Sequence, residues 1–99
     1  MTMTSGPVVH PGEILREEYL IPLNMSAGAL ARKLNVPRTR IERISTEKIG
    51  ITADTAYRLA KFFRTTPQFW MNLQVAYDLA VSADEMTTTL SKIDEIESA

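Results

Sequence analysis

The sequence predicts an all-α fold of five helices with an additional C-terminal helix. Apolar residues recur three and four positions apart along most of the chain, which is the period of an amphipathic helix. Residues that commonly cap helices, two of them followed by proline, stand before these periodic segments. At 99 residues, 44% of them hydrophobic and 23% charged, the chain suits one domain with a modest core.

The first predicted helix follows a short segment without periodicity. Residues 1–9 are expected to form a flexible N-terminus, because they are few, small and unpatterned. His10 and Pro11 mark the helix start, with His10 as a cap or a surface residue and Pro11 near the first helical position. The helix should end before Pro22 and brace the next two helices. Its predicted buried side is Ile14, Leu15, Tyr19 and Leu20.

Two short helices joined by a tight turn are predicted within residues 26–48. Ser26 is the expected N-cap of the first, whose inward stripe is Ala27, Leu30, Ala31 and Leu34. Asn35 tolerates the left-handed conformation found at helix ends, and Val36 is held extended by the proline after it. The second helix should therefore begin at about Pro37, with Val36 filling the turn.

The outer face of that second helix carries the residues predicted to read DNA. Its inward anchors are Ile41 and Ile44, which leave outside Arg38, Thr39, Arg40, Glu42 and Arg43. A helix-turn-helix motif places its second helix in the DNA major groove. Arginine can donate two hydrogen bonds to guanine, and threonine can offer a hydroxyl or a methyl group to a base. We therefore predict base contacts from Arg38, Thr39 and Arg43.

Two further helices are predicted before residue 82. Thr52 or Asp54 caps the first, whose inward face is Ala56, Leu59, Ala60 and Phe63. Thr66 followed by Pro67 begins the second, which has a wide apolar face of Phe69, Trp70, Leu73, Ala76, Tyr77 and Ala80. Because one packing partner rarely needs so wide a face, we predict that part of it is a dimer interface. The predicted interface residues are Phe69, Trp70, Leu73 and Tyr77.

The last predicted helix is acidic and amphipathic. Residues 82–85 form a capping-box pattern, and a narrow apolar stripe follows at Met86, Leu90, Ile93 and Ile96. We therefore divide the chain into a flexible segment, 1–9, a helix-turn-helix domain, 10–81, and a C-terminal part, 82–99, with a helix over 84–97.

Charge is unevenly distributed along the chain, although its net value is only −1. Residues 32–64 contain nine basic and three acidic side chains, whereas residues 65–99 contain one basic and six acidic side chains. A basic middle with an acidic tail suits a surface that faces phosphate, while the far end meets another partner.

Several classes of protein are disfavoured by the sequence. Cysteine is absent, which excludes disulfides and thiolate metal sites and fits a reducing cytosol. No stretch has the apolar length of a membrane span, and residues 1–7 lack the pattern of a signal peptide, so a soluble cytoplasmic protein is expected. The single histidine, His10, has no visible nucleophile or metal-ligand companion. We therefore predict no enzyme, no catalytic residue, no metal site and no cofactor.

Four motifs stand in a fixed order along residues 10–81: HPGEILREEYL, NVPRTRIERI, GITADTAYRLAKFF and TPQFWMNLQVAYDLA. In this order and spacing they resemble the HigA antitoxins of bacterial toxin-antitoxin modules, within the Cro/repressor-type group of helix-turn-helix proteins, the lambda-repressor-like fold. The resemblance implies a five-helix DNA-binding domain that binds a palindromic operator as a homodimer and represses its own operon. It also implies that the protein neutralises a HigB-type toxin that cleaves mRNA.

The resemblance adds phosphate contacts to the base contacts. By position these would come from Ser26, where a helix N-terminus attracts phosphate, and from Arg40 and Lys48. After the second helix of the motif, which we call the reading helix, the family commonly has glycine and two basic residues. This chain has Glu47-Lys48-Ile49 there. Glu47 and Ile49 therefore weaken the phosphate contact that the resemblance implies at this loop.

Other interpretations stay open at this point. The chain could be a solitary helix-turn-helix regulator without a toxin, or a protein-interaction module in which the motif only packs. Glu42 suits an ion pair with a neighbouring arginine better than contact with cytosine.

Overall fold

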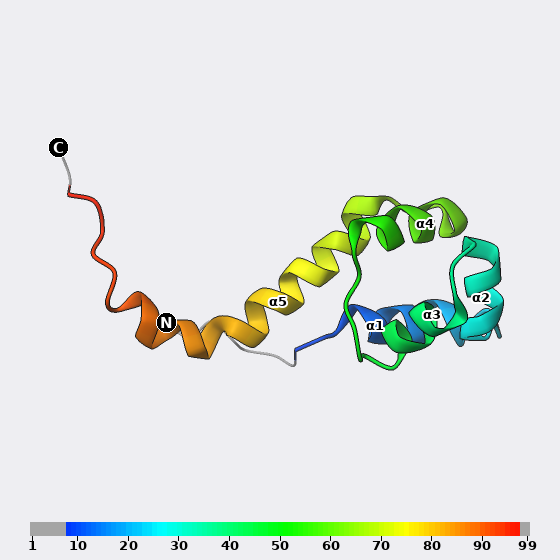
Figure 1. Ribbon diagram of the computed structural model, residues 1–99, viewed down its shortest axis with the longest axis horizontal. Coiled ribbons are helices and arrows are strands. Elements are labelled where there is room, and N and C mark those ends of the chain that lie inside the picture. The colour runs from blue at the N-terminus through cyan, green and yellow to red at the C-terminus, as the bar shows by residue number, and fades with distance from the viewer. Residues whose placement is uncertain (1–7, 98–99) are drawn as a thin grey trace.

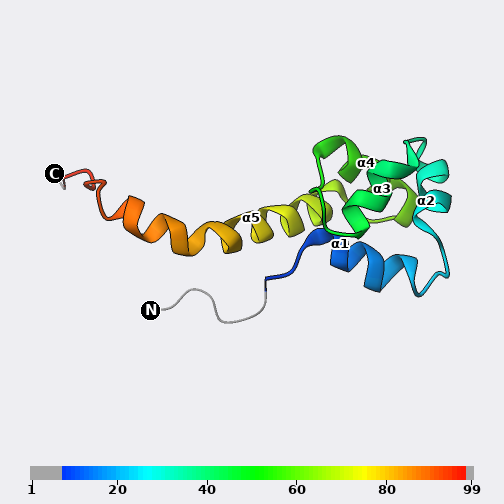
Figure 2. The same cartoon turned by 60° about the horizontal axis from the view of Figure 1, so that its bottom comes forward.

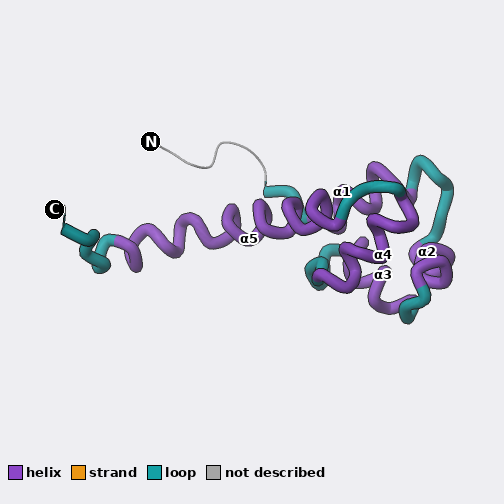
Figure 3. The backbone as a smooth tube through the Cα atoms, turned by 90° about the horizontal axis from the view of Figure 1, so that it is seen from above, coloured by secondary structure: helices purple, strands orange, loops and turns teal. Residues whose placement is uncertain are grey.

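The computed structural model describes residues 8–97, and in this part of the chain all regular structure is helical. The helices are α1 (Pro11–Ile14), continued by the π-helical turn η1 (Leu15–Leu20), α2 (Ala27–Leu34), α3 (Arg38–Ser45), α4 (Ala53–Phe63) and α5 (Pro67–Leu90) (Figure 3). The five-helix fold predicted from the sequence is confirmed. The predicted flexibility of residues 1–7 lies outside the described residues, and Val8 and Val9 are exposed and non-helical.

Most helices begin where the sequence predicts, because short-range chemistry fixes their first turns. Four capping side chains accept a hydrogen bond from a backbone N–H two or three residues later: His10 in α1, Ser26 in α2, Thr52 in α4 and Thr66 in α5. Thr52 rather than Asp54 is therefore the cap of α4. α3 begins one residue later than predicted, at Arg38, because Pro37 keeps an extended ψ of 144° and stands at the cap position.

The core lies between the first four helices and the start of α5. Trp70 is fully buried there, with the rings of Tyr19 and Phe69 at centroid distances of 5.1 and 5.0 Å. Its indole Nε1 donates to Thr65 Oγ1 at 2.8 Å, which satisfies the one polar atom of the ring. Large aliphatic side chains that are also fully buried include Leu15, Leu30, Ile41, Ile44 and Leu59. Ile41 and Ile44 are thus the inward anchors of α3, as predicted.

α5 is one long helix that leaves the bundle (Figures 1 and 2). Its first turns pack on α4 and α1, and the remainder extends away, so the longest dimension of the chain is 55 Å. No helix within residues 8–97 has the length and apolar character to cross a membrane.

The separate sixth helix predicted over residues 84–97 is wrong. α5 runs through the predicted boundary at 81 and 82 and ends at Leu90, after which residues 91–97 are non-helical. Neither proline nor glycine interrupts residues 68–90, so the capping-box pattern at Ser82 lies in the middle of a helix instead of starting one. Of the predicted stripe, Met86 and Leu90 lie on α5, whereas Ile93 and Ile96 lie beyond it and are exposed.

Candidate nucleic-acid interface

α2 and α3 form a helix-turn-helix with a tightly bonded turn. Asn35 adopts the predicted left-handed conformation, with φ 59° and ψ 46°, and the Val36 N–H donates to Ala31 O at 3.0 Å. Val36 is partly buried against the core and fills the turn, as predicted. Ser26 Oγ accepts from the Ala29 N–H at 3.0 Å, and Ser26 itself is exposed at the start of α2. The motif therefore fixes α3 against the bundle by its inward face.

The three predicted base readers lie on the outer surface of α3. Arg38 is 71% exposed in its side chain, and Thr39 and Arg43 are also exposed. Arg38 Nε forms an ion pair with Glu42 Oε2 at 3.2 Å, which confirms the ion-pair role predicted for Glu42. Exposed pairs of this kind contribute at most about 1 kcal/mol, so Arg38 can exchange this partner for another.

Arg40 differs from these three residues, because its guanidinium points to α4. Arg40 Nη1 donates to Asp54 Oδ2 at 2.5 Å and to Thr55 Oγ1 at 3.5 Å, and the side chain is only 35% exposed. The same Asp54 oxygen accepts from Arg58 Nε at 3.0 Å. The hydrogen bonds from Arg58 and then Arg40 hold the pKa of Asp54 below its usual value. This geometry ties Arg40 to the first turn of α4, and its predicted phosphate contact stays a prediction.

Asp54 was not among the predicted site residues. The i,i+4 spacing of Asp54 and Arg58 indicates their pairing on one helix, but the approach of Arg40 depends on how α3 packs against α4.

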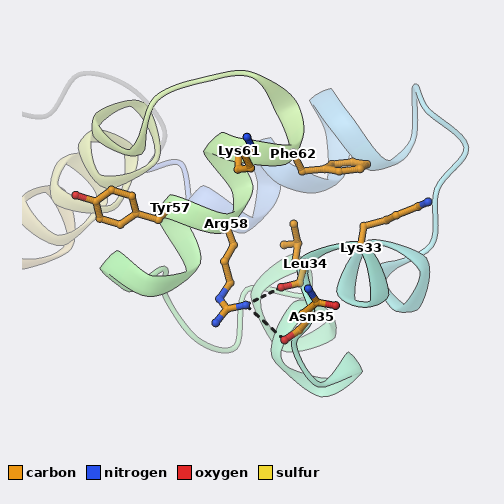
Figure 4. Close-up of a pocket in the computed structure, with 7 residues that line it drawn as sticks. All are labelled: Lys33, Leu34, Asn35, Tyr57, Arg58, Lys61 and Phe62. Atoms are coloured by element: carbon orange, nitrogen blue, oxygen red, sulfur yellow. Dashed lines mark hydrogen bonds between the residues drawn. The ribbon is translucent and has the colours of Figure 1, made fainter.

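Arg58 also closes the turn of the helix-turn-helix (Figure 4). Its Nη1 donates to Leu34 O at 2.7 Å and to Asn35 O at 3.4 Å, so a cation stands at the C-terminal end of α2, where carbonyl groups are otherwise unpaired. The side chain borders a cavity of about 340 Å³ lined also by Lys33, Tyr57, Lys61 and Phe62. Arg58 therefore joins α4 to the motif.

The loop after α3 has a defined course. Glu47 occupies a positive φ of 65°, which explains why a glycine suits this position. Arg16 Nη1 donates to Ser45 O at 2.6 Å and to Glu47 Oε2 at 3.1 Å, so η1 fastens the loop. Hydrogen bonds to Glu17 and Glu47 raise the pKa of Arg16. The hydrogen bond from Arg16, which the tertiary fold brings close, thus holds Glu47 in a backbone conformation that glycine adopts more easily.

Lys48 lies on the same surface as part of the reading helix. Its side chain is exposed, and its N–H donates to Arg43 O at 2.7 Å. Lys48 and Arg43 line one surface depression together with Glu42 and Thr46. The fold therefore brings a predicted base reader next to a predicted phosphate contact.

Comparison with known proteins identifies the family to which this geometry belongs. A helix-turn-helix family model matches residues 15–70. The chain belongs to the helix-turn-helix family. This helix-turn-helix protein is 53% identical over 79 residues to virulence-associated protein I of Dichelobacter nodosus, a match that covers 80% of this chain and 73% of the relative.

Two solved structures of antitoxins share the fold of this helix-turn-helix protein. One is antitoxin HigA of Pseudomonas aeruginosa with the higBA promoter, at 41% identity and a TM-score of 0.87, covering 92% of this chain and 100% of that chain. The other is antitoxin GraA in complex with its operator, at 36% identity and a TM-score of 0.89, covering 99% and 100%. The resemblance to HigA antitoxins is therefore confirmed.

The four residues predicted to form a dimer interface of the helix-turn-helix protein differ in how exposed they are. Trp70 is fully buried within one chain and has no surface to offer a partner. Leu73 and Tyr77 are half-buried, and the Tyr77 ring packs edge-on against His10 at a centroid distance of 4.7 Å. Phe69 is exposed at the start of α5. Further along α5 stand more exposed apolar residues that are not among the four predicted interface residues: Val75, Leu79, Val81, Met86 and Leu90.

Proposed function

We propose that this protein is a DNA-binding antitoxin that represses its own operon as a dimer and neutralises a HigB-type toxin. The observation that carries the DNA-binding part is the exposed basic outer face of α3, held in a helix-turn-helix by the buried residues Ile41 and Ile44. The related antitoxins HigA and GraA, whose structures contain promoter or operator DNA, support the same function for this fold.

In the proposed complex α3 lies in the DNA major groove. Arg38, Thr39 and Arg43 contact base edges, and arginine recognises guanine through its O6 and N7 atoms. The first turn of α2 behind Ser26 and the side chain of Lys48 contact the phosphate backbone, which sets the register of α3 without reading sequence. Two chains related by a twofold axis place their α3 helices about 34 to 36 Å apart in successive grooves of a palindromic operator.

The seam of the proposed dimer is the outer part of α5. Val75, Leu79, Met86 and Leu90 fall within a sector of about 60° at 3.6 residues per turn, so they form one apolar stripe. Leu79, 68% exposed, is the most exposed of the four. A stripe of this kind on a helix that leaves the bundle is typical of an interface between chains. The predicted interface residues Phe69, Leu73 and Tyr77 lie about 90° to 170° around α5 from the centre of this stripe and are not part of it.

Neutralisation of a toxin rests on the similarity to HigA antitoxins. A solitary regulator with no toxin partner is the alternative. The two are distinguished by the neighbouring gene and by co-purification: an adjacent small basic ribonuclease that co-purifies with this chain supports the antitoxin, and its absence supports the solitary regulator.

The experiment that tests DNA binding compares a duplex from the gene's own promoter with a scrambled duplex of equal length and composition. The promoter duplex is expected to bind more tightly, with an affinity that falls as salt rises. Equal affinity for both duplexes, or affinity independent of salt, would show that the chain is not a sequence-specific regulator.

A further inference from the structure

The contacts of Arg40 separate it from the other arginines of α3. Arg38 is twice as exposed as Arg40, and its one carboxylate partner, Glu42, lies on the same helix. Arg40 instead bonds to two side chains of α4, the Asp54 carboxylate and the Thr55 hydroxyl. The Arg40 side chain therefore reaches from α3 to the first turn of α4.

Asp54 is well placed to hold Arg40. It lies in the first turn of α4, where the helix dipole favours a negative charge. Its Oδ2 atom accepts hydrogen bonds from both Arg40, on α3, and Arg58, on α4. Arg58 also donates to the backbone carbonyls of Leu34 and Asn35 at the end of α2. One carboxylate thereby links α3, α4 and the end of α2.

From this geometry we propose that Asp54 is a positioning residue that keeps Arg40 from acting as a phosphate contact and so limits the affinity of the protein for DNA. The inference rests on the proposed DNA-binding function. The Asp54 carboxylate cancels one of the two positive charges of Arg40 and Arg58, and a guanidinium that stays bonded to this carboxylate releases no counterion when DNA binds. The base readers Arg38 and Arg43 remain available, while the total number of phosphate contacts stays low.

The test measures the salt dependence of DNA affinity for Asp54→Asn. This change removes the charge that holds Arg40 and keeps a small polar side chain in the first turn of α4. We expect the slope of log affinity against log salt to become steeper by about 0.9 per chain, on both the promoter duplex and the scrambled duplex. Asp84→Asn is the matched control, because it changes the net charge equally at an exposed position on α5 and should leave the slope unchanged.

Arg40→Gln identifies the cation responsible. In the wild-type background it should leave the slope unchanged, and in the Asp54→Asn background it should restore the wild-type slope. A slope of Asp54→Asn equal to that of wild type overturns the proposal. So does a flattening by about 0.9 per chain when Arg40→Gln is made in wild type, because Arg40 would then already contact phosphate.

The outcomes also separate this inference from the function on which it rests. If wild type binds neither duplex in a salt-dependent way, the DNA-binding function itself fails. If wild type binds and the slopes do not follow the pattern above, only the role of Asp54 fails. Thermal melting of each variant verifies folding, and Asp54→Ser replaces Asp54→Asn if the latter does not fold.

Discussion

Gly12→Ala is expected to destabilise the protein strongly, because α1 crosses α3 at this residue without room for a methyl group. A Cβ atom on Gly12 would lie 1.8 Å from the backbone oxygen of Ile44 and 2.9 Å from its carbonyl carbon. Relieving the contact to 3.0 Å requires a shift of about 1.2 Å, which two buried helix backbones must share. Overpacking of a close-packed interior costs about 1 to 3 kcal/mol, and a contact with backbone belongs at the upper end of that range.

Gly28→Ala provides the matched control, since it is the same chemical change in another helix. There the Cβ would lie 3.0 Å from Cδ of Arg38, a flexible and exposed side chain that can move aside. Alanine is a better helix former than glycine by about 1 kcal/mol, so this variant should be as stable as wild type or slightly more stable. A difference of about 3 kcal/mol between the variants corresponds to roughly 12 °C or more in melting temperature for a chain of this size.

The assay is thermal and urea unfolding followed by far-UV circular dichroism, with all variants at one protein concentration because stability would depend on concentration in the proposed dimer. Since Ile44 belongs to α3, Gly12→Ala should also weaken promoter binding under conditions where the variant is still folded. Equal melting temperatures for Gly12→Ala and Gly28→Ala would refute the close crossing of α1 and α3.

Four further predictions concern the surface. Arg38→Ala should lose about 1 to 3 kcal/mol of discrimination at particular base pairs, measured with promoter duplexes substituted one pair at a time, and uniform weakening would contradict its role as a base reader. Lys48→Ala should weaken promoter and scrambled DNA alike and flatten the salt slope by about 0.9 per chain; an unchanged slope removes it from the phosphate contacts. Leu79→Glu should sediment as a monomer with unchanged helix content, whereas a dimer would place the seam elsewhere. The folded pKa of Asp54 is below its unfolded value, so its contribution to stability is present above the unfolded pKa and lost as pH falls through the folded pKa. Wild type should therefore be more stable than Asp54→Asn at neutral pH, and the difference should disappear in acid unfolding experiments.

The features that sequence predicted well depend on neighbours in the chain. Ser26 and Thr66 cap helices through N–H groups three residues away, and Asn35 ends α2 through its own backbone conformation. The periodic stripe that identified Ile41 and Ile44 is equally local. These signals located the helix-turn-helix and its outer face to within one residue.

The features that sequence missed depend on packing between distant segments. Arg40 meets a carboxylate 14 residues away, and Arg16 fastens a loop 31 residues away, neither of which follows from helical periodicity. The end of α5 was misplaced for another reason: a capping-box pattern is permissive, and Ser82 is compatible with a helix interior when no glycine or proline interrupts the helix. Trp70 was assigned to an interface because a wide apolar face can be covered by the same chain or by a partner, and periodicity does not distinguish the two.

The charge of the basic middle segment overstates the charge available to DNA. Among its nine basic residues, Arg40 and Arg58 share the Asp54 carboxylate, and Arg58 also stabilises the end of α2. Composition counts these cations equally with Arg43, which is exposed on α3, and with Lys48, which is exposed in the loop after α3. The salt slope of DNA binding counts only cations that reach phosphate. We therefore expect the salt slope of wild type to be smaller than its nine basic residues in this segment would give. The steeper slope expected for Asp54→Asn measures the contribution of the cation that Asp54 keeps from phosphate.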